Sequence, residues 1–228
     1  RDWLYVDDHT SAIFSILKKG KKGEKYNIGT NNEMTNLKLD VAYWDSRYKA
    51  SNTGWDIGYA NKIHVDYVKS NYPKTAKILE PGAGNAYEVN ELWNEGYAHV
   101  YALDYSPTAK ETFTARNPNF PSDQYLIGDF FELQGTFDLI LEQTFFCALD
   151  PSLRKAYIHK MHTLLRPGGK VMGVLFNFTT TDGPPFGGSA QEYRLLFEEK
   201  FTIIRLEDAK NSIPQRQGNE LLFELIKK

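Results

Sequence analysis

Short apolar runs alternate with amphipathic stretches along the chain after residue 40. The apolar runs predict seven strands, at residues 77–81, 98–104, 124–128, 136–142, 170–178, 200–207 and 220–227. Apolar residues at helical spacing predict helices between them, at residues 86–95, 107–116, 151–165 and 189–197. Two earlier helices are expected, one beginning at residues 43–48 and one over residues 59–71 that Pro73 ends.

Strands that alternate with helices are typical of a parallel sheet with right-handed crossovers. The last two predicted strands have no helix between them, so we expect them to form an antiparallel edge. The pattern therefore predicts an α/β fold whose seven-stranded sheet is mostly parallel and whose last strand is antiparallel.

A glycine-rich turn follows the first predicted strand. Glu80, Gly82 and Gly84 stand at alternate positions, and the next predicted helix begins at once. Glycine lets a ligand approach the backbone, and a helix start offers free N–H groups. The dinucleotide fingerprint would require a third glycine where this chain has Tyr87, so a pyrophosphate ligand is disfavoured. A glycine turn without any ligand remains the alternative.

Acidic and aromatic residues follow the next two strands. Asp104 ends the second strand, twenty residues after Gly84, where a carboxylate suits the two hydroxyls of a ribose. Ser106 is a better N-cap than Asp104 for the helix that follows, and Tyr105 is expected to cover one edge of the nucleoside. After the third strand, Asp129 is expected to bind the adenine amino group and Phe130 to lie on the ring face. Aromatic residues after a strand are more often part of the core, which leaves the place of Phe131 open.

This series of motifs resembles the class I S-adenosylmethionine-dependent methyltransferases. Further motifs resemble the thiopurine methyltransferase family, nearest to its thiol and halide methyltransferases: Trp44-x-x-x-Tyr48, Thr53-x-Trp55-Asp56-x-Gly58, residues 145–154, Gly183-Pro184-Pro185-Phe186 and Ile213-Pro214-x-Arg216-x-Gly218. The resemblance covers about residues 41–228. It implies a Rossmann-like fold, S-adenosylmethionine as cofactor, and an N-terminal aromatic helix that folds over the cofactor.

The resemblance also assigns site residues. By position, Trp44, Tyr48 and Trp55 would contact the cofactor, and Gln143 would lie at the end of the fourth strand. Tyr48 replaces a tryptophan that is common in the halide and thiol branch, and Gln143 stands where a tyrosine is common, so the acceptor stays open. Arg154 is expected to position an anionic acceptor; its alternative is a surface arginine on the helix over residues 151–165.

Methyl transfer from a sulfonium is an in-line displacement, which a dry aromatic pocket favours. We therefore expect methyl transfer to a small thiol, sulfide, thiocyanate or halide. The alternatives are a thiopurine-like aromatic thiol, O- or N-methylation of a small metabolite, and a cofactor-binding protein without turnover.

Residues 1–39 have a different resemblance. Arg1–His9 and Tyr26–Gly29 resemble a segment of the nucleotide-sugar 4,6-dehydratases, but that family's glycine-rich loop and Tyr-x-x-x-Lys pair are absent from this sequence. The pattern predicts a strand at residues 3–6, a helix from residue 8 to 20 and a strand at residues 25–29. A segment this short cannot bury a core. We expect it to be a fragment with a linker rather than a domain, followed by a methyltransferase domain over residues 40–228.

Composition narrows the possible partners. The net charge of −2 gives no electrostatic footprint for nucleic acid or an anionic membrane. Cys147 is the single cysteine, which excludes an intramolecular disulfide, and its expected role is that of a small buried apolar residue. His159 and His162 lack the spacing of a metal motif, so no metal is expected. We expect a cytoplasmic monomer whose partner is a small-molecule acceptor.

Overall fold

The computed structural model describes residues 16, 18–19, 36–180 and 183–228. The chain divides into two compact units, Arg1–Trp44 and Asp45–Lys228. The predicted strands at residues 3–6 and 25–29 lie outside the described residues, and residues 16, 18 and 19 of the predicted helix over residues 8–20 are helical. Among the described residues, no helix is both long and apolar enough to cross a membrane.

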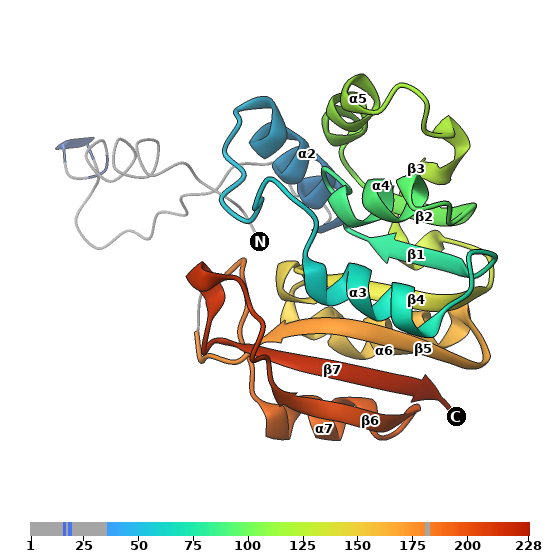
Figure 1. Cartoon of the computed structure of the whole chain (residues 1–228). Coiled ribbons are helices and arrows are strands. Elements are labelled where there is room, and N and C mark those ends of the chain that lie inside the picture. The colour runs from blue at the N-terminus through green and yellow to red at the C-terminus, as the bar shows by residue number, and fades with distance from the viewer. Residues whose placement is uncertain (1–15, 17, 20–35, 181–182) are drawn as a thin grey trace. The chain divides into compact units, whose positions relative to one another are not determined.

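The second unit contains one sheet of seven strands in the order β3-β2-β1-β4-β5-β7-β6, seen from β3 at the top to β6 at the bottom of Figure 1. All seven predicted strands are confirmed, with small shifts at their ends: β1 (Lys77–Pro81), β2 (His99–Asp104), β3 (Tyr125–Ile127), β4 (Phe137–Gln143), β5 (Leu165–Phe176), β6 (Phe201–Asp208) and β7 (Glu220–Lys227). The largest difference is in β5, which begins at Leu165 because that residue already pairs with Phe137, across a register shift.

The C-terminal strand β7 lies inside the sheet. It is antiparallel to β5 on one side and to β6 on the other, while the pairs among β1 to β5 are parallel. The predicted antiparallel pairing of the last two strands is confirmed. The insertion of β7 between β5 and β6 is an additional feature of the structure.

Six helices accompany the sheet among the described residues from 36 onward: α2 (Asn36–Lys49), α3 (Lys62–Asn71), α4 (Tyr87–Asn94), α5 (Pro107–Arg116), α6 (Arg154–Leu164) and α7 (Ala190–Phe197). Side-chain caps fix several of their starts. Asn61 accepts a hydrogen bond from the Ile63 N–H at α3, Ser106 from the Ala109 N–H at α5, and Ser189 from the Glu192 N–H at α7. Short 3-10 turns, including η2 (Phe130–Glu132), η3 (Phe146–Ala148) and η4 (Pro151–Leu153), connect the other elements.

The two faces of the sheet carry separate apolar clusters because side chains alternate along each strand. Ile78 of β1 packs in the cluster with α3, α4 and α5, whereas its neighbour Leu79 packs in the cluster with α6 and α7. The result is a three-layer α/β/α arrangement. Strand β1 has β2 on one side and β4 on the other, so the strand order reverses there, and ligands bind at such reversals beyond the carboxyl ends of the strands.

Candidate active site

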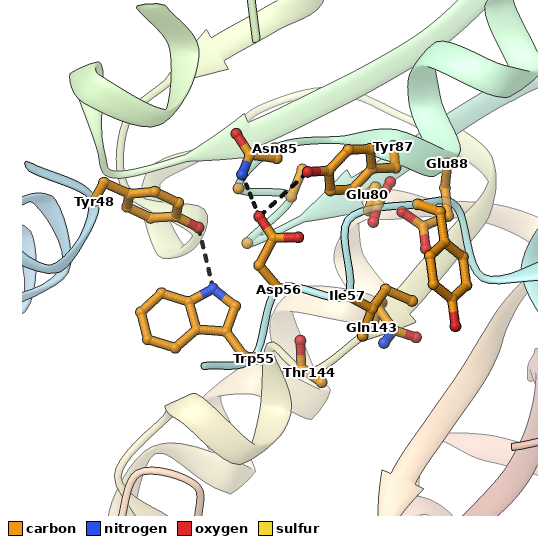
Figure 2. Close-up of a pocket in the computed structure, with 14 residues that line it drawn as sticks. Tyr48, Trp55, Asp56, Ile57, Glu80, Asn85, Tyr87, Glu88, Gln143 and Thr144 are labelled. Carbon is orange, nitrogen blue, oxygen red and sulfur yellow. Dashed lines mark hydrogen bonds between the residues drawn. The ribbon is translucent and has the colours of Figure 1, made fainter. Parts of the chain in front are cut away.

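A pocket opens at the carboxyl ends of β1 and β4. It encloses about 430 Å³, counting the space at its open mouth. Its walls come from the end of α2, residues 55–59, the glycine turn, the start of α4 and the end of β4 (Figure 2). Six residues that the sequence singled out line it: Tyr48, Trp55, Glu80, Gly82, Gly84 and Gln143.

The glycine turn requires its glycines. Gly82 and Gly84 have φ angles of 65° and 53°, in the left-handed region that L side chains rarely adopt. A Cβ atom at Gly82 would lie 2.4 Å from the Phe145 ring, and one at Gly84 would lie 2.2 Å from the Tyr48 hydroxyl oxygen. The turn therefore has no room for side chains, and its backbone forms part of the pocket surface.

Asp104 braces this turn from the neighbouring strand. Its Oδ2 accepts a hydrogen bond from the Gly84 N–H at 2.8 Å, and its Oδ1 accepts one from the Ser106 N–H at 2.8 Å. Asp104 is only 9% exposed, and burial raises its pKa against the effect of these bonds. Ser106 caps α5, as the sequence predicted. Asp104 lies beside the turn without lining the pocket itself.

Two aromatic side chains form the opposite wall. The rings of Tyr48 and Trp55 meet edge to face with centroids 5.8 Å apart, and the indole N–H of Trp55 donates to the Tyr48 hydroxyl at 3.3 Å. Arg216 donates to the Trp55 carbonyl at 2.7 Å, which ties this wall to the segment before β7. Trp44 belongs to the other unit of the chain, so its contact with a ligand stays a prediction.

A hydrogen-bonded cluster joins the loop after Trp55 to the glycine turn. Asp56 accepts hydrogen bonds from the Asn85 side-chain amide and from the Tyr87 hydroxyl at 3.4 Å (Figure 2). It also accepts one from the Gly58 N–H at 2.7 Å. Neither Asn85 nor the Asp56 carboxylate had a predicted role. The spacing Asp56-x-Gly58 is a local signal for a turn of this kind, but it does not reveal the partner 29 positions away.

Two buried carboxyl groups also line the pocket. Glu80 is 2% exposed and Glu88, in the first turn of α4, is 5% exposed. Glu88 accepts the Asn61 N–H at 2.8 Å, whereas Oε2 of Glu80 has no hydrogen-bond partner. Burial raises the pKa of both groups, and the charge of Glu88 adds to the rise at Glu80. Neither forms an ion pair within the described part of the chain. A cation placed beside these carboxyl groups would favour their ionised forms, so this wall suits a cationic ligand.

Three predicted cofactor residues lie away from the pocket lining. Tyr105 is half-buried beside Asp104, and Asp129 accepts the Phe131 N–H at 2.8 Å as the cap of η2. Phe130 is 2% exposed and packs in the core, with its ring centroid 5.1 Å from that of Phe145. The predicted contacts of all three residues with a nucleoside stay predictions.

Arg154 is buried rather than on the surface. It is 6% exposed, forms an ion pair with Glu192, and donates to the Gly187 carbonyl at 2.7 Å. Its guanidinium also lies over the Phe146 ring, 4.9 Å from the centroid. Arg154 therefore holds the segment before α7 and does not line the pocket; a role in positioning the acceptor stays a prediction.

Nothing in the described residues resembles a metal centre, since no three or more His, Cys, Asp or Glu side chains gather there in a way that could hold an ion. Cys147 is buried, as predicted, and burial raises the pKa of its thiol well above the ordinary value.

Comparison with known proteins adds to this picture. Residues 39–226 match the family model "Thiopurine S-methyltransferase", and residues 1–29 match that of the "NAD dependent epimerase/dehydratase family". "Probable thiol methyltransferase 2" of Arabidopsis thaliana is 33% identical over 186 residues, which cover 78% of this chain and 82% of that protein. "Thiocyanate methyltransferase 1" of Brassica oleracea is 30% identical over the same number of residues and the same shares of the two chains.

A solved structure has the same fold. The 1,6-didemethyltoxoflavin-N1-methyltransferase of Burkholderia thailandensis, crystallised with S-adenosylhomocysteine, aligns with a TM-score of 0.68 and 18% identity, over 88% of this chain and 93% of that one.

Proposed function

Because this chain belongs to the thiopurine S-methyltransferase family, we propose that it transfers a methyl group from S-adenosylmethionine to a small thiol, sulfide, thiocyanate or halide. Membership makes it an S-adenosylmethionine-dependent methyltransferase; the acceptor is the proposed part. The observation that carries the proposal is the glycine turn braced by Asp104, at the reversal of strand order and opposite an aromatic wall.

The residues present fit S-adenosylmethionine. Asp104 would accept the ribose hydroxyls, because each of its oxygens uses one lone pair on the backbone and keeps another. Gly82 and Gly84 would receive the amino-acid end of the molecule on a backbone without side chains. The unpartnered carboxyl oxygen of Glu80 would meet its ammonium group, which supplies the missing partner.

The aromatic wall has a chemical role. When bound, the cofactor supplies a methyl group on a positively charged sulfur. The faces of Tyr48 and Trp55 attract such a cation, and their bulk excludes water that would stabilise the separated charges of donor and acceptor. A thiol of pKa ~8.5 is partly ionised at neutral pH, so this site does not need a strong base beside the acceptor.

The relatives support a small sulfur acceptor. Two relatives at 30% identity or above have names that specify a thiol and a thiocyanate as acceptors. The alternative acceptor is an aromatic thiol of the thiopurine type, supported by the description of the family model. O- or N-methylation of a small metabolite, and cofactor binding without turnover, are the further alternatives.

The test is a product assay on the full chain. We would incubate it with S-adenosylmethionine and, in separate reactions, hydrosulfide, thiocyanate, iodide and an aryl thiol, and measure volatile methylated products in the headspace and S-adenosylhomocysteine in solution. We expect turnover with hydrosulfide or thiocyanate and at least tenfold less with Asp104→Asn. Turnover with the aryl thiol alone would favour the alternative acceptor, an aromatic thiol of the thiopurine type. Cofactor binding in calorimetry without any product would refute the proposal.

A further inference from the structure

Asp45 lies where the end of α2 meets the first turn of α5. Its Oδ1 accepts hydrogen bonds from the Ser106 hydroxyl at 2.7 Å and the Thr108 N–H at 3.1 Å, and its Oδ2 pairs with Lys49 at 2.7 Å. Burial opposes ionisation, but these bonds hold the pKa of Asp45 below its ordinary value. The carboxylate is therefore an anion fixed in one orientation.

These bonds complete the start of α5. A helix leaves the N–H groups of its first turn unpaired. Pro107 has none, Ser106 accepts that of Ala109, and Asp45 accepts that of Thr108. A negative charge at this end of a helix is also favourable. Asp45 thus completes the cap of a helix whose N-cap residue, Ser106, stands 61 positions later in the sequence. In doing so it fixes residues 45–49 of α2 against α5.

The cap is continuous with the glycine turn. Ser106, which donates to Asp45 through its hydroxyl, donates through its N–H to Asp104 at 2.8 Å. The other oxygen of Asp104 accepts the Gly84 N–H at 2.8 Å. One chain of hydrogen bonds therefore joins the end of α2 to the floor of the pocket.

Tyr48 stands three positions after Asp45, on the same side of the helix. Its hydroxyl oxygen occupies the space directly beside Gly84, where a Cβ atom would lie 2.2 Å away. The hydroxyl also accepts the indole N–H of Trp55. The position of residues 45–49 consequently decides where the aromatic wall stands relative to the glycine turn.

We propose that Asp45 is a positioning residue of the cofactor site: by fixing the end of α2 to the first turn of α5, it holds Tyr48 over the glycine turn. This inference rests on the proposed function, because it assigns Tyr48 to the wall that receives the cofactor. Asp45 itself does not line the pocket. Its loss acts on cofactor binding through Tyr48.

A double-mutant cycle tests this coupling. The full chain, Asp45→Ala, Tyr48→Ala and the double variant would each be titrated with S-adenosylhomocysteine by calorimetry. We expect Asp45→Ala to raise Kd about tenfold, close to 1.4 kcal/mol. The same change in a chain that already carries Tyr48→Ala should raise Kd less than about twofold, because the side chain to be positioned is gone.

Two further variants separate the parts of the interaction. Lys49→Ala removes the ion pair but leaves both bonds to α5, so its Kd should stay within about twofold of the parent. Asp45→Asn keeps an oxygen that can accept from Ser106 and Thr108, and should restore most of the affinity lost in Asp45→Ala. If Asp45→Ala does not fold, as judged by thermal unfolding, Asp45→Ser gives the same cycle with a side chain too short to reach both donors.

Each outcome decides the question. Independent effects of Asp45→Ala and Tyr48→Ala on Kd would overturn the inference, as would an unchanged Kd in Asp45→Ala; both leave the proposed function standing. A parent chain that binds no S-adenosylhomocysteine would refute the proposed function and this inference together.

Discussion

Glu142 carries a buried carboxyl group one residue before the pocket-lining Gln143. Its Oε1 accepts the N–H groups of Phe145 at 2.8 Å and Phe146 at 2.9 Å, and its Oε2 accepts the Tyr157 hydroxyl at 2.6 Å. Burial raises the pKa of Glu142 to about 7 in spite of these bonds. We predict that this group makes the protein less stable as pH rises, and that Glu142→Gln removes the effect.

The magnitude follows from proton linkage. The folded state binds the Glu142 proton more tightly than the unfolded state, because the pKa rises from 4.5 to about 7. The stabilisation from this proton is complete below about pH 4.5 and is lost as pH rises through about 7. A difference of about 2.5 pKa units at 1.36 kcal/mol each gives a total loss of about 3 kcal/mol.

The assay is urea unfolding of the parent and of Glu142→Gln between about pH 5 and pH 8, followed by tryptophan fluorescence. The difference between the two proteins reports the titration of Glu142 together with its effect on Glu80, whose pKa the charge of Glu142 raises. Tyr157→Phe is the matched variant. It removes a hydrogen bond that lowers the pKa of Glu142, so that pKa should rise and the loss of stability should extend to higher pH.

If the free energies of unfolding of the parent and of Glu142→Gln differ by a constant amount, within about 0.5 kcal/mol over this pH range, the reasoning is refuted. A parent that gains stability relative to the variant as pH rises would refute it as well. Either result would mean that the three hydrogen bonds outweigh burial and keep the carboxylate ionised.

Three substitutions test the site directly. Asp104→Asn weakens the charged acceptor for the cofactor hydroxyls and should raise the Kd for S-adenosylhomocysteine about 10- to 100-fold in calorimetry; an unchanged Kd would contradict the assignment. Gly84→Ala sets a Cβ atom against the Tyr48 hydroxyl at a strained φ, so the Kd should rise and the thermal midpoint should fall. Parent-like values of both would contradict the close packing described for the turn. Arg154→Lys replaces the fork that holds the Gly187 carbonyl; if Arg154 positions the acceptor, kcat/KM for the acceptor should fall at least tenfold with the cofactor Kd unchanged, and an unaffected kcat/KM would remove Arg154 from that role.

The fold was largely predictable because a strand that is buried on both faces appears in the sequence as a short apolar run. The runs at residues 78–79 and 100–103 are apolar, and glycine, proline and cap residues follow them. The order of the strands in the sheet has no such local pattern in the sequence. Residues 220–227 read as a strand wherever they pair, so their place between β5 and β6 could not be derived from periodicity.

The site was predictable where its chemistry is local in sequence. The turn at Gly82 and Gly84 is recognisable from spacing alone. The roles of Asp45, Asp56 and Glu88 were not, because their partners stand 61, 29 and 27 positions away and no pattern of residue types connects them.

For Phe130 and Arg154 the sequence does not show whether the side chain faces the pocket or the core. An aromatic residue after a strand, or an arginine at the start of a helix, has the same local sequence whether it faces a pocket or the core. In this chain both are buried, and neither lines the pocket.

The place of β7 bears on how the chain folds during synthesis. Domains made on the ribosome fold as units, and N-terminal parts emerge first. Here β7, which follows the other six strands of the sheet along the chain, is an interior strand: it pairs with β5 and β6, and Leu221, Phe223 and Leu225 are almost fully buried. Until residues 220–227 leave the exit tunnel, β5 has an open edge and β6 has no neighbour, so the sheet cannot close before that point. A truncation that removes residues 220–227 would leave a protein with a permanently open sheet, exposed to pairing with other nascent chains.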